Sequence, residues 1–290
     1  MAGYTPGQVL GGKTVALGSL LLGAVDSSGV AWTVAPDGLR GWAGTGVRTQ
    51  YSERQADHGS YAGPTYAAAR VISIAGTITA PDMAGLDAAV EQLIAAAGLT
   101  DTVLTVGESI PKRAVVRRSG EVLVEQITDR VARYSLLLTA ADPRRYSTTL
   151  QSASTGLPSA SGGVTLPITL PLTITASASS GQITLTNSGT IATRPLFTVA
   201  GPVTTPAIVV QYPDSTVKQL LYSDTLGAGD VLVIDTDAHS AVLNGQASRR
   251  RYLSGSWPEI PPGATVTVQW NAASADPAAL LTGSCRSAWM

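Results

Sequence analysis

The stretch of residues 229–270, GDVLVIDTDAHSAVLNGQASRRRYLSGSWPEIPPGATVTVQW, reads as a run of short β-strands. Val231–Thr236 is apolar and β-branched, and Asn244-Gly245 is a strong hairpin signal because both residues tolerate a positive φ. Arg249–Leu253 is expected as the next strand. Ala264–Trp270 alternates as a closing strand after a Pro-Pro-Gly turn. The stretch predicts a β-meander within a sandwich.

The composition indicates a β-rich chain that is large enough for two hydrophobic cores. Its 290 residues exceed what one core usually supports, so we expect two domains. Hydrophobic residues make up 44% and charged residues only 13%, which suits a surface that is buried in an assembly. The formal net charge of −1 argues against nucleic-acid readout.

One cysteine and one apolar run bear on the compartment in which the chain folds. Cys285 is the only cysteine, which excludes an internal disulfide and a thiolate metal cluster and suits a reducing cytoplasm. The apolar run Val15–Val25 is too short for a membrane span. It could form the core of a signal peptide, with Lys13 as a poor basic region. We favour a folded segment, because Asp26–Val34 continues as a turn and a strand.

The first half of the chain reads as strands around one helix. Tyr66–Ile78 alternates with a period of two, which is typical of a strand with one buried face. Pro81–Gly98 is predicted to be a helix that Asp82 caps and Gly98 ends. Its expected apolar stripe consists of Leu86, Val90, Leu93 and Ile94. Further strands are expected at Val30–Val34, Val47–Gln50, Thr102–Val106, Lys112–Ser119 and Arg130–Ala140.

A stretch with little apolar mass divides the chain. Residues 151–163, QSASTGLPSASGG, are predicted to be a linker between an N-terminal domain at 1–150 and a C-terminal domain at 164–290. Strands are expected at residues 164–174, Gln182–Thr186, Pro195–Val199 and Ala207–Gln211. Their regular spacing favours a β-sandwich. The tail, Asp276–Met290, is expected to be a short helix or an arm.

The residues that could carry catalysis or bind a metal are few. Asp235, Asp237 and His239 alternate and could hold a metal ion, but we favour a turn whose aspartates accept from the local backbone. Asp57-His58-Gly59 could supply half of a catalytic pair, but a glycine-bearing loop is the better interpretation. No GxSxG motif is present, and the run Gly11-Gly12-Lys13-Thr14 lacks the earlier glycine of a phosphate loop. We therefore predict no enzyme activity, no cofactor and no bound metal.

One basic run and several tryptophans are candidates for contacts with partners. Arg249-Arg250-Arg251 could contact an acidic partner or nucleic acid, but we favour a solvated strand end. Trp257 could stack on a sugar ring, but a loop position between core and rim is the more ordinary interpretation. Trp270 is expected in the core. The candidate partner or glycan contacts are therefore Trp257, Arg249, Arg250 and Arg251.

A set of short motifs occurs in a fixed order along the chain. In the first half they are Leu39–Trp42, Arg54, His58-Gly59, Arg70–Ile78, the single helix and Asp142-Pro143-Arg144. In the second half they are Asn187-Ser188-Gly189, Arg194-Pro195, Gly201-Pro202, Gly229-Asp230, Ile234-Asp235-Thr236, Leu243-Asn244-Gly245, Ser256-Trp257 and Pro262-Gly263. Their order and spacing resemble those of the distal tail (Dit) proteins, the siphovirus-type tail component family. The resemblance covers nearly the whole chain.

This resemblance implies a mainly β protein with two parts. The first would be an N-terminal β-sandwich or split-barrel ring domain with one α-helix, and the second a C-terminal galectin-like β-sandwich. The family forms rings, usually hexameric, that join the tail tube protein to the tail-associated baseplate protein and can carry receptor-binding proteins. The implied location is the tail tip of the virion, after assembly in the host cytoplasm. The alternative from the residues is a carbohydrate-binding sandwich that recognises a host cell-wall glycan through Trp257.

Overall fold

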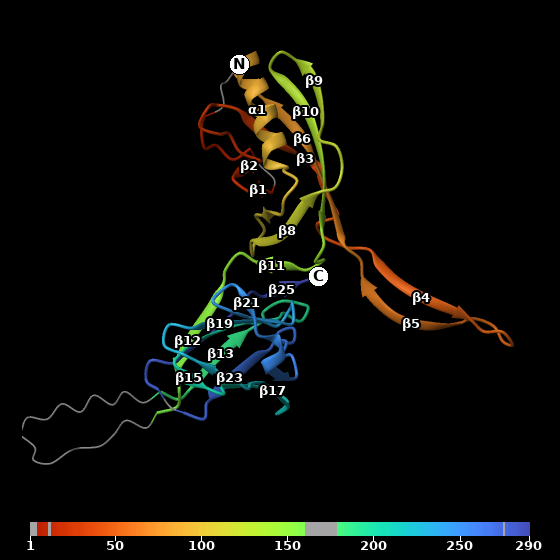
Figure 1. Ribbon diagram of the computed structural model, residues 1–290. Coiled ribbons are helices and arrows are strands. Elements are labelled where there is room, and N and C mark those ends of the chain that lie inside the picture. Colours follow the sequence, from red (N-terminus) through yellow and green to blue (C-terminus); the bar gives the residue numbers. More distant parts are fainter. Residues whose placement is uncertain (1–4, 11–12, 160–178, 275) are drawn as a thin grey trace, which may run out of the picture. The chain divides into compact units, whose positions relative to one another are not determined.

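The computed structural model describes residues 5–10, 13–159, 179–274 and 276–290, which form two compact units. Unit 1 comprises residues 1–148 with Met290, and unit 2 comprises Thr149–Trp289. The residues are mostly in strands, with one α-helix, so the expectation of a mainly β fold is confirmed (Figure 1). No helix among these residues has the length and apolar character needed to cross a membrane.

Unit 1 is built on antiparallel strands in the order β2-β1-β7-β8-β10-β6-β3, with β9 beside β10 and β11 beside β8. The bounds of its elements are β1 Val15–Leu17, β2 Leu20–Leu22, β3 Ala31–Arg40, β4 Val47–Glu53, β5 Ser60–Ala67, β6 Arg70–Thr79, α1 Met83–Ala96, β7 Thr102–Val106, β8 Lys112–Arg118, β9 Leu123–Thr128, β10 Val131–Ala140 and β11 Arg145–Ser147.

The pairing of β6 with β10 forms the centre of unit 1. Ile74 lies opposite Leu136 and Ile72 opposite Leu138, and all four side chains are buried. The period-two pattern therefore creates one apolar face, against which α1 packs through Leu86, Ala89 and Leu93.

Helix α1 begins and ends close to the expected positions. The Asp82 carboxylate accepts a hydrogen bond from the Gly85 backbone N–H at 2.7 Å, which confirms the predicted cap. The apolar stripe is wrong at one position, because Ile94 is 39% exposed whereas Ala89 is buried. Ala89, Leu86 and Leu93 share one face at spacings of three, four and seven residues, and Ile94 lies at its margin.

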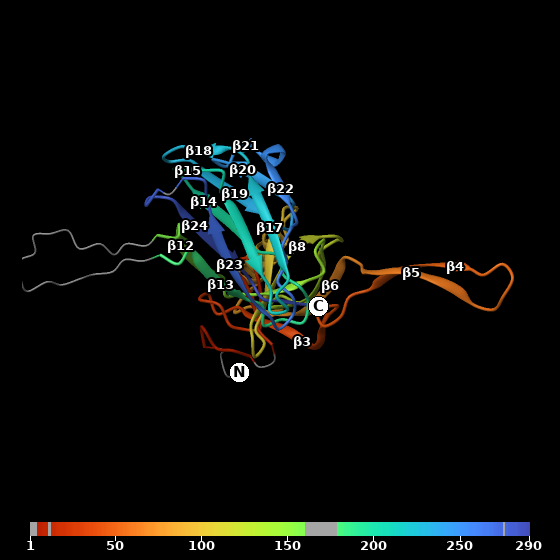
Figure 2. The ribbon, with the colours of Figure 1, turned by 90° about the horizontal axis from the view of Figure 1, so that it is seen from below.

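Unit 2 is a sandwich of two antiparallel sheets (Figure 2). One sheet has the order β12-β24-β14-β19-β20-β21 and the other β13-β23-β16-β17-β22, with a small β15–β18 ribbon alongside. The bounds are β12 Gln151–Gly156, β13 Gln182–Thr186, β14 Leu196–Ala200, β15 Val203–Thr204, β16 Ala207–Gln211, β17 Val217–Tyr222, β18 Thr225–Leu226, β19 Val231–Asp235, β20 Ser240–Leu243, β21 Ala247–Ser248, the 3-10 turn η1 Arg250–Tyr252, β22 Leu253–Gly255, β23 Thr265–Asn271, β24 Leu280–Cys285 and β25 Ala288–Trp289.

The hairpin at Asn244-Gly245 forms as expected between β20 and β21, with φ of 51° and 69° at the two residues. Trp270 is fully buried in the core between the sheets, also as expected. The strand expected at Arg249–Leu253 is wrong. The chain leaves one sheet at β21, turns through η1 and joins the other sheet at β22, so continuous strand pairing is broken at this crossing.

Two further sequence expectations need correction. Residues 151–156 of the expected linker form β12, which pairs with β24 along its whole length, because a polar strand can still use its backbone hydrogen bonds at a sheet edge. The tail expected as a helix or an arm contains β24, which lies between β12 and β14. Leu281 and Cys285 alternate toward the core there, and a Cβ at Gly283 would lie 2.6 Å from Ile183 Cδ1. The strand expected at 164–174 and the remainder of the linker, 160–163, lie outside the described residues.

Candidate interaction surfaces

The ribbon formed by β4 and β5 extends away from the sheets of unit 1 (Figures 1 and 2). It is a two-stranded sheet of its own, and none of its residues is buried. Four large side chains on it are between 58% and 69% exposed: Val47, Tyr51, Tyr61 and Tyr66. An isolated two-stranded hairpin is only marginally stable in water. The strand pairing of the arm therefore does not explain why so much apolar surface is exposed to solvent.

Local contacts nevertheless define the shape of the arm. Arg48 lies over the Tyr66 ring at 5.8 Å and Arg54 over the Tyr61 ring at 4.9 Å. The cross-strand register shifts between Thr49 and Tyr51, which marks a bulge. Asp57-His58-Gly59 lies at the tip, where Asp57 pairs with Arg54 at 3.6 Å. The tip is therefore the loop that the sequence favoured.

A buried arginine fixes the base of the arm. The Arg70 guanidinium donates to the backbone oxygens of Gly41, Trp42 and Gly44 at 3.1, 2.7 and 3.0 Å, and to Pro143 O at 2.8 Å. Desolvation lowers the pKa of Arg70. The four carbonyl oxygens accept from its Nε and Nη1, while the buried Nη2 has no partner among the residues that the structure describes. Arg70 thus joins three of the sequence motifs, the Gly-Trp segment, the strand start and the Asp-Pro-Arg close, although no local pattern predicted that they would meet.

A second polar cluster contacts Trp42 through its indole N–H. Glu108 accepts hydrogen bonds from Trp42 Nε1 at 3.0 Å, Lys13 Nζ at 3.2 Å and Lys112 Nζ at 2.5 Å. Burial works against the charged carboxylate, but the hydrogen bonds from Lys112, Lys13 and Trp42 outweigh it and lower the pKa of Glu108 to about 2. Glu108 is therefore ionised at neutral pH and acts as a structural anchor.

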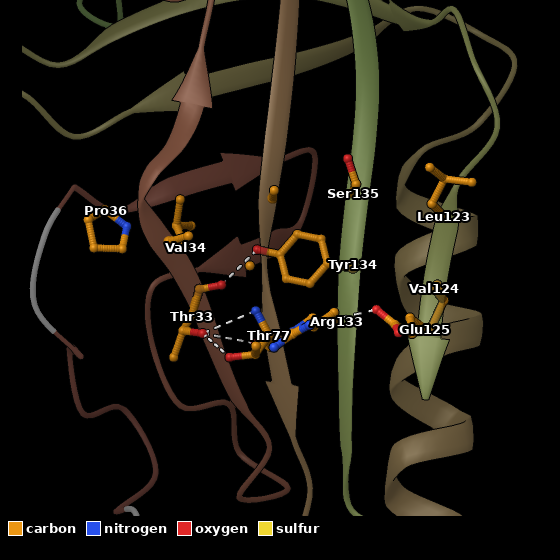
Figure 3. A pocket seen from close by; sticks show the side chains of 13 residues that line it. Thr33, Val34, Pro36, Thr77, Leu123, Val124, Glu125, Arg133, Tyr134 and Ser135 are labelled. Atoms are coloured by element: carbon orange, nitrogen blue, oxygen red, sulfur yellow. Dashed lines mark hydrogen bonds and ion pairs between the residues drawn. The ribbon is translucent and has the colours of Figure 1, made fainter. Parts of the chain in front are cut away.

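A groove of about 810 Å³ runs across β3, β6, β10 and β9 (Figure 3). Tyr134 crosses it opposite Gly76 and donates to Thr33 O at 2.9 Å, while Arg133 pairs with Glu125 at 3.9 Å. Burial raises the pKa of Tyr134 above its usual range, so this hydroxyl is no acid or base at neutral pH. The groove offers shape and apolar surface but no catalytic arrangement.

The predicted contact residues of unit 2 gather at η1. Arg249 lies over the Tyr252 ring at 5.6 Å and Arg251 over the same ring at 4.6 Å. Arg250 lies over the Trp257 ring at 5.0 Å. The structure thus brings together all four residues that the sequence singled out, and adds Tyr252, which sequence reasoning missed.

His239 and Trp257 stack on each other, with ring centroids 4.7 Å apart and an interplanar angle of 13°. Because Arg250 also lies over the Trp257 ring, protein groups already cover this half-buried side chain. A sugar ring needs an open aromatic face, so this geometry gives little support to glycan stacking on Trp257.

The aspartates before His239 have separate local roles. Asp235 Oδ1 accepts from the backbone N–H groups of Asp237 and Ala238 at 2.8 and 3.0 Å, and Asp237 pairs with Arg194 at 2.7 Å. His239 contacts Trp257 instead. Within the described ranges no group of three acidic, histidine or cysteine side chains is placed to hold a metal. Cys285 is buried, and burial raises the pKa of its thiol to about 11.

Comparisons with known proteins concern the sequence of unit 2 and the fold of most of the chain. Residues 188–280 match the family described as siphovirus-type tail component, C-terminal domain. No curated protein matches the chain in sequence. Among solved structures, SPP1 Dit (gp 19.1), described as a paradigm of the hub adsorption apparatus in phages that infect Gram-positive bacteria, is 12% identical. The match covers 89% of this chain and 94% of that one, with a TM-score of 0.58.

A chain of the phage P2 baseplate in its activated conformation with Ca is 10% identical, with 96% of this chain and 98% of that one covered and a TM-score of 0.49. The SPP1 Dit comparison concerns the fold, and the family match concerns the sequence of unit 2. Residues 188–280 of unit 2 are thus similar in sequence to the C-terminal domain of the siphovirus-type tail components, and the fold of the chain is similar to that of SPP1 Dit, so the resemblance of this chain to the distal tail proteins is confirmed.

Proposed function

We propose that this chain is a structural, non-enzymatic distal tail protein of a long-tailed, non-contractile phage. It forms a hexameric ring at the tail tip that joins the tail tube protein to the tail-associated baseplate protein. It also acts as a hub for receptor-binding proteins that serve host adsorption. The chain assembles in the host cytoplasm and ends in the virion. The family match of residues 188–280 and the Dit-like fold support the identity of the component.

The observation that carries the ring is the uncovered β4–β5 arm. Its four exposed apolar and aromatic side chains have no core to enter within unit 1. Tyrosine loses little conformational entropy on binding and is enriched at interfaces between proteins. A second copy of the chain is the partner that is always present during assembly, so we assign the arm to the contact between neighbouring copies.

The low charge of the chain agrees with this assignment. Only 13% of the residues are charged, and a ring with two stacked partners buries surface on several sides of each copy. Arg48 and Arg54 also hold two of the tyrosines from the same arm, which reduces the ordering that an interface would require.

The test is the native mass of the purified protein at rising concentration. We expect a ring for the natural sequence and a monomer for the variant Tyr51→Ser/Tyr61→Ser/Tyr66→Ser. The matched control is Val217→Ser, an exposed apolar residue of unit 2, which should leave the mass of the ring unchanged. A natural protein that remains monomeric at every concentration would contradict the proposal.

The second candidate function is the carbohydrate-binding sandwich. Its specific support is the half-exposed Trp257 on a loop of unit 2. The ring of His239 and the guanidinium of Arg250, which both contact the Trp257 ring, weaken this candidate. Saturation by soluble cell-wall fragments that is lost in Trp257→Ala would favour this candidate, and a protein that binds no fragment would remove it.

A further inference from the structure

Three consecutive arginines lie at a turn of unit 2 beside two aromatic side chains. Arg249, Arg250, Arg251, Tyr252 and Trp257 define what we call the arginine–aromatic patch. The patch lies where the chain crosses from β21 to β22, so its side chains are not drawn into either sheet. Arg250 and Arg251 are exposed, and Arg249, Tyr252 and Trp257 are half-buried.

The guanidinium groups of the patch are held by rings instead of carboxylates. Each lies within 5.6 Å of the centroid of Tyr252 or Trp257. Arg250 also donates to Leu253 O at 2.7 Å, and Arg251 to the Tyr252 hydroxyl at 2.5 Å. Such contacts fix the planar groups, and each guanidinium has five N–H donors, more than these contacts use. The patch is therefore preorganised for an incoming anion.

No carboxylate of the described residues forms an ion pair with these three arginines. Asp230 is a candidate competitor, since its charge interacts with Arg249, and Asp224 acts on the neighbouring Tyr222. The Asp230 carboxylate, however, already accepts from Asn244 Nδ2 at 2.9 Å and from Gly227 N–H at 2.8 Å, and these hydrogen bonds lower the pKa of Asp230. The positive charge of the patch is thus left without a direct counterion.

Two buried hydrogen-bond donors, one in the patch and one next to it, lack acceptors in the part of the chain that the structure describes. The Tyr222 side chain is 1% exposed, and its ring meets the Tyr252 ring edge-on at 6.2 Å. Neither its hydroxyl nor Arg249 Nε has a hydrogen-bond partner among the described residues. Buried donors without acceptors are rare in folded proteins, and these two show that the described residues around the patch supply fewer acceptors than donors.

From these observations we propose that the arginine–aromatic patch is a docking surface for an acidic segment of a partner protein. Tyrosine, tryptophan and arginine are the residue types that dominate protein–protein contacts, and guanidinium groups bind carboxylates in two-pronged fashion. Leu221, which is 38% exposed, lies on β17 directly opposite Ser254 of β22. This apolar neighbour suits a polypeptide better than a phosphate polymer. The proposal does not depend on ring formation, because the patch belongs entirely to unit 2.

The experiment uses the full chain and a fluorescein-labelled peptide of alternating glutamate and alanine as the probe. We expect saturable binding at low salt, about 50 mM, that weakens steeply as salt rises. The variant Arg249→Gln/Arg250→Gln/Arg251→Gln should weaken binding roughly tenfold or more. Arg250→Gln/Arg251→Gln, which spares the half-buried Arg249, should weaken it roughly threefold. Arg130→Gln, an exposed arginine of unit 1, is the matched control and should change nothing.

Three results would overturn the proposal. The first is the absence of peptide binding at low salt. The second is binding that both arginine variants retain in full while their circular dichroism remains that of the natural protein. The third is tighter binding of inorganic polyphosphate than of the glutamate peptide through the same arginines, which would assign the patch to a phosphate polymer. Native mass measured on the same samples reports the ring separately, so failure of this proposal and failure of the ring can be distinguished.

Discussion

Two hairpins of this molecule are both antiparallel strand pairs but have opposite surroundings. In the β19–β20 hairpin, Leu232, Ile234 and Ala241 are buried by the facing sheet, and the strands show the alternation of a half-buried sheet. In the β4–β5 arm no residue is buried, although the strands are longer and rich in tyrosine. Pairing alone therefore does not explain why the arm is formed, and its apolar side chains indicate a partner.

The largest expected effect comes from separating the two units. A fragment of residues 1–148, which keeps the arm, should still associate, whereas a fragment starting at Thr149 should fold as a cooperative β protein and remain a monomer. The cut must precede β12, because that strand pairs with β24. Analytical ultracentrifugation of both fragments checks this. Assembly by the C-terminal fragment alone would reverse the assigned roles.

A cavity in the buried hairpin should destabilise unit 2 strongly. Ile234→Ala removes a side chain that is 1% exposed, and such truncations cost about 2–5 kcal/mol. Urea unfolding followed by circular dichroism measures the loss. A change below about 1 kcal/mol would show that the site relaxes fully and that the core of this hairpin is less important than its burial suggests.

Removing the buried guanidinium at the base of the arm should cost less. A lysine ammonium has three N–H donors and cannot replace the four hydrogen bonds that the Arg70 guanidinium donates, so we expect Arg70→Lys to lower the stability of unit 1 by about 2–3 kcal/mol. Arg48→Lys, which changes an exposed arginine of the arm itself, is the control and should have an effect of at most about 0.5 kcal/mol. Equal losses in the two variants would argue against a special role of Arg70.

The Glu108 cluster makes the stability of unit 1 depend on pH. Because the folded-state pKa of Glu108 is lowered to about 2 from 4.5, its stabilisation is fully present above about pH 4.5 and is lost as the pH falls toward 2. We expect Glu108→Gln to lower the unfolding free energy of unit 1 by about 1–2 kcal/mol at pH 7 and to reduce the loss of stability at acidic pH. Thermal unfolding of both proteins at several pH values tests this prediction. A variant that loses as much stability at acidic pH as the natural protein would be the contrary result.

The smallest expected change in stability is at the arm. Tyr61→Ala should alter the unfolding free energy of the unassembled protein by at most about 0.5 kcal/mol, because the side chain is 65% exposed. The same substitution should weaken self-association. Measurement of both quantities on one sample separates the two effects, and a large loss of monomer stability would mean that the arm already packs on its own unit.

Local patterns in the sequence predicted those parts of the molecule that depend on neighbours in the chain. The Asn244-Gly245 turn and the Asp82 cap are of this kind, since backbone conformation and one side-chain hydrogen bond decide them. Strands β7, β13 and β16 also have the expected bounds, because their apolar alternation is unbroken.

The errors arose where distant residues decide the structure. Gly283 is part of a central strand because β24 pairs with β12 on one side and β14 on the other, and the close approach of Ile183 favours a glycine there. Nothing near Gly283 in the sequence reports either contact. Residues 151–156 become a strand only because β24 offers an unpaired edge. For the candidate surfaces, the sequence identified the arginines and Trp257 by type, but the unpartnered Tyr222 and the Arg70 contacts depend on three-dimensional packing.

The most direct test of the central claim is amide hydrogen exchange of the two hairpins in dilute and in concentrated protein. We predict that the β19–β20 amides are protected in both samples, whereas the β4–β5 amides exchange rapidly when the protein is dilute and become protected when it assembles. Protection of the arm in the dilute monomer, or rapid exchange of the arm in an assembled ring, would contradict the assignment of β4–β5 to the contact between copies.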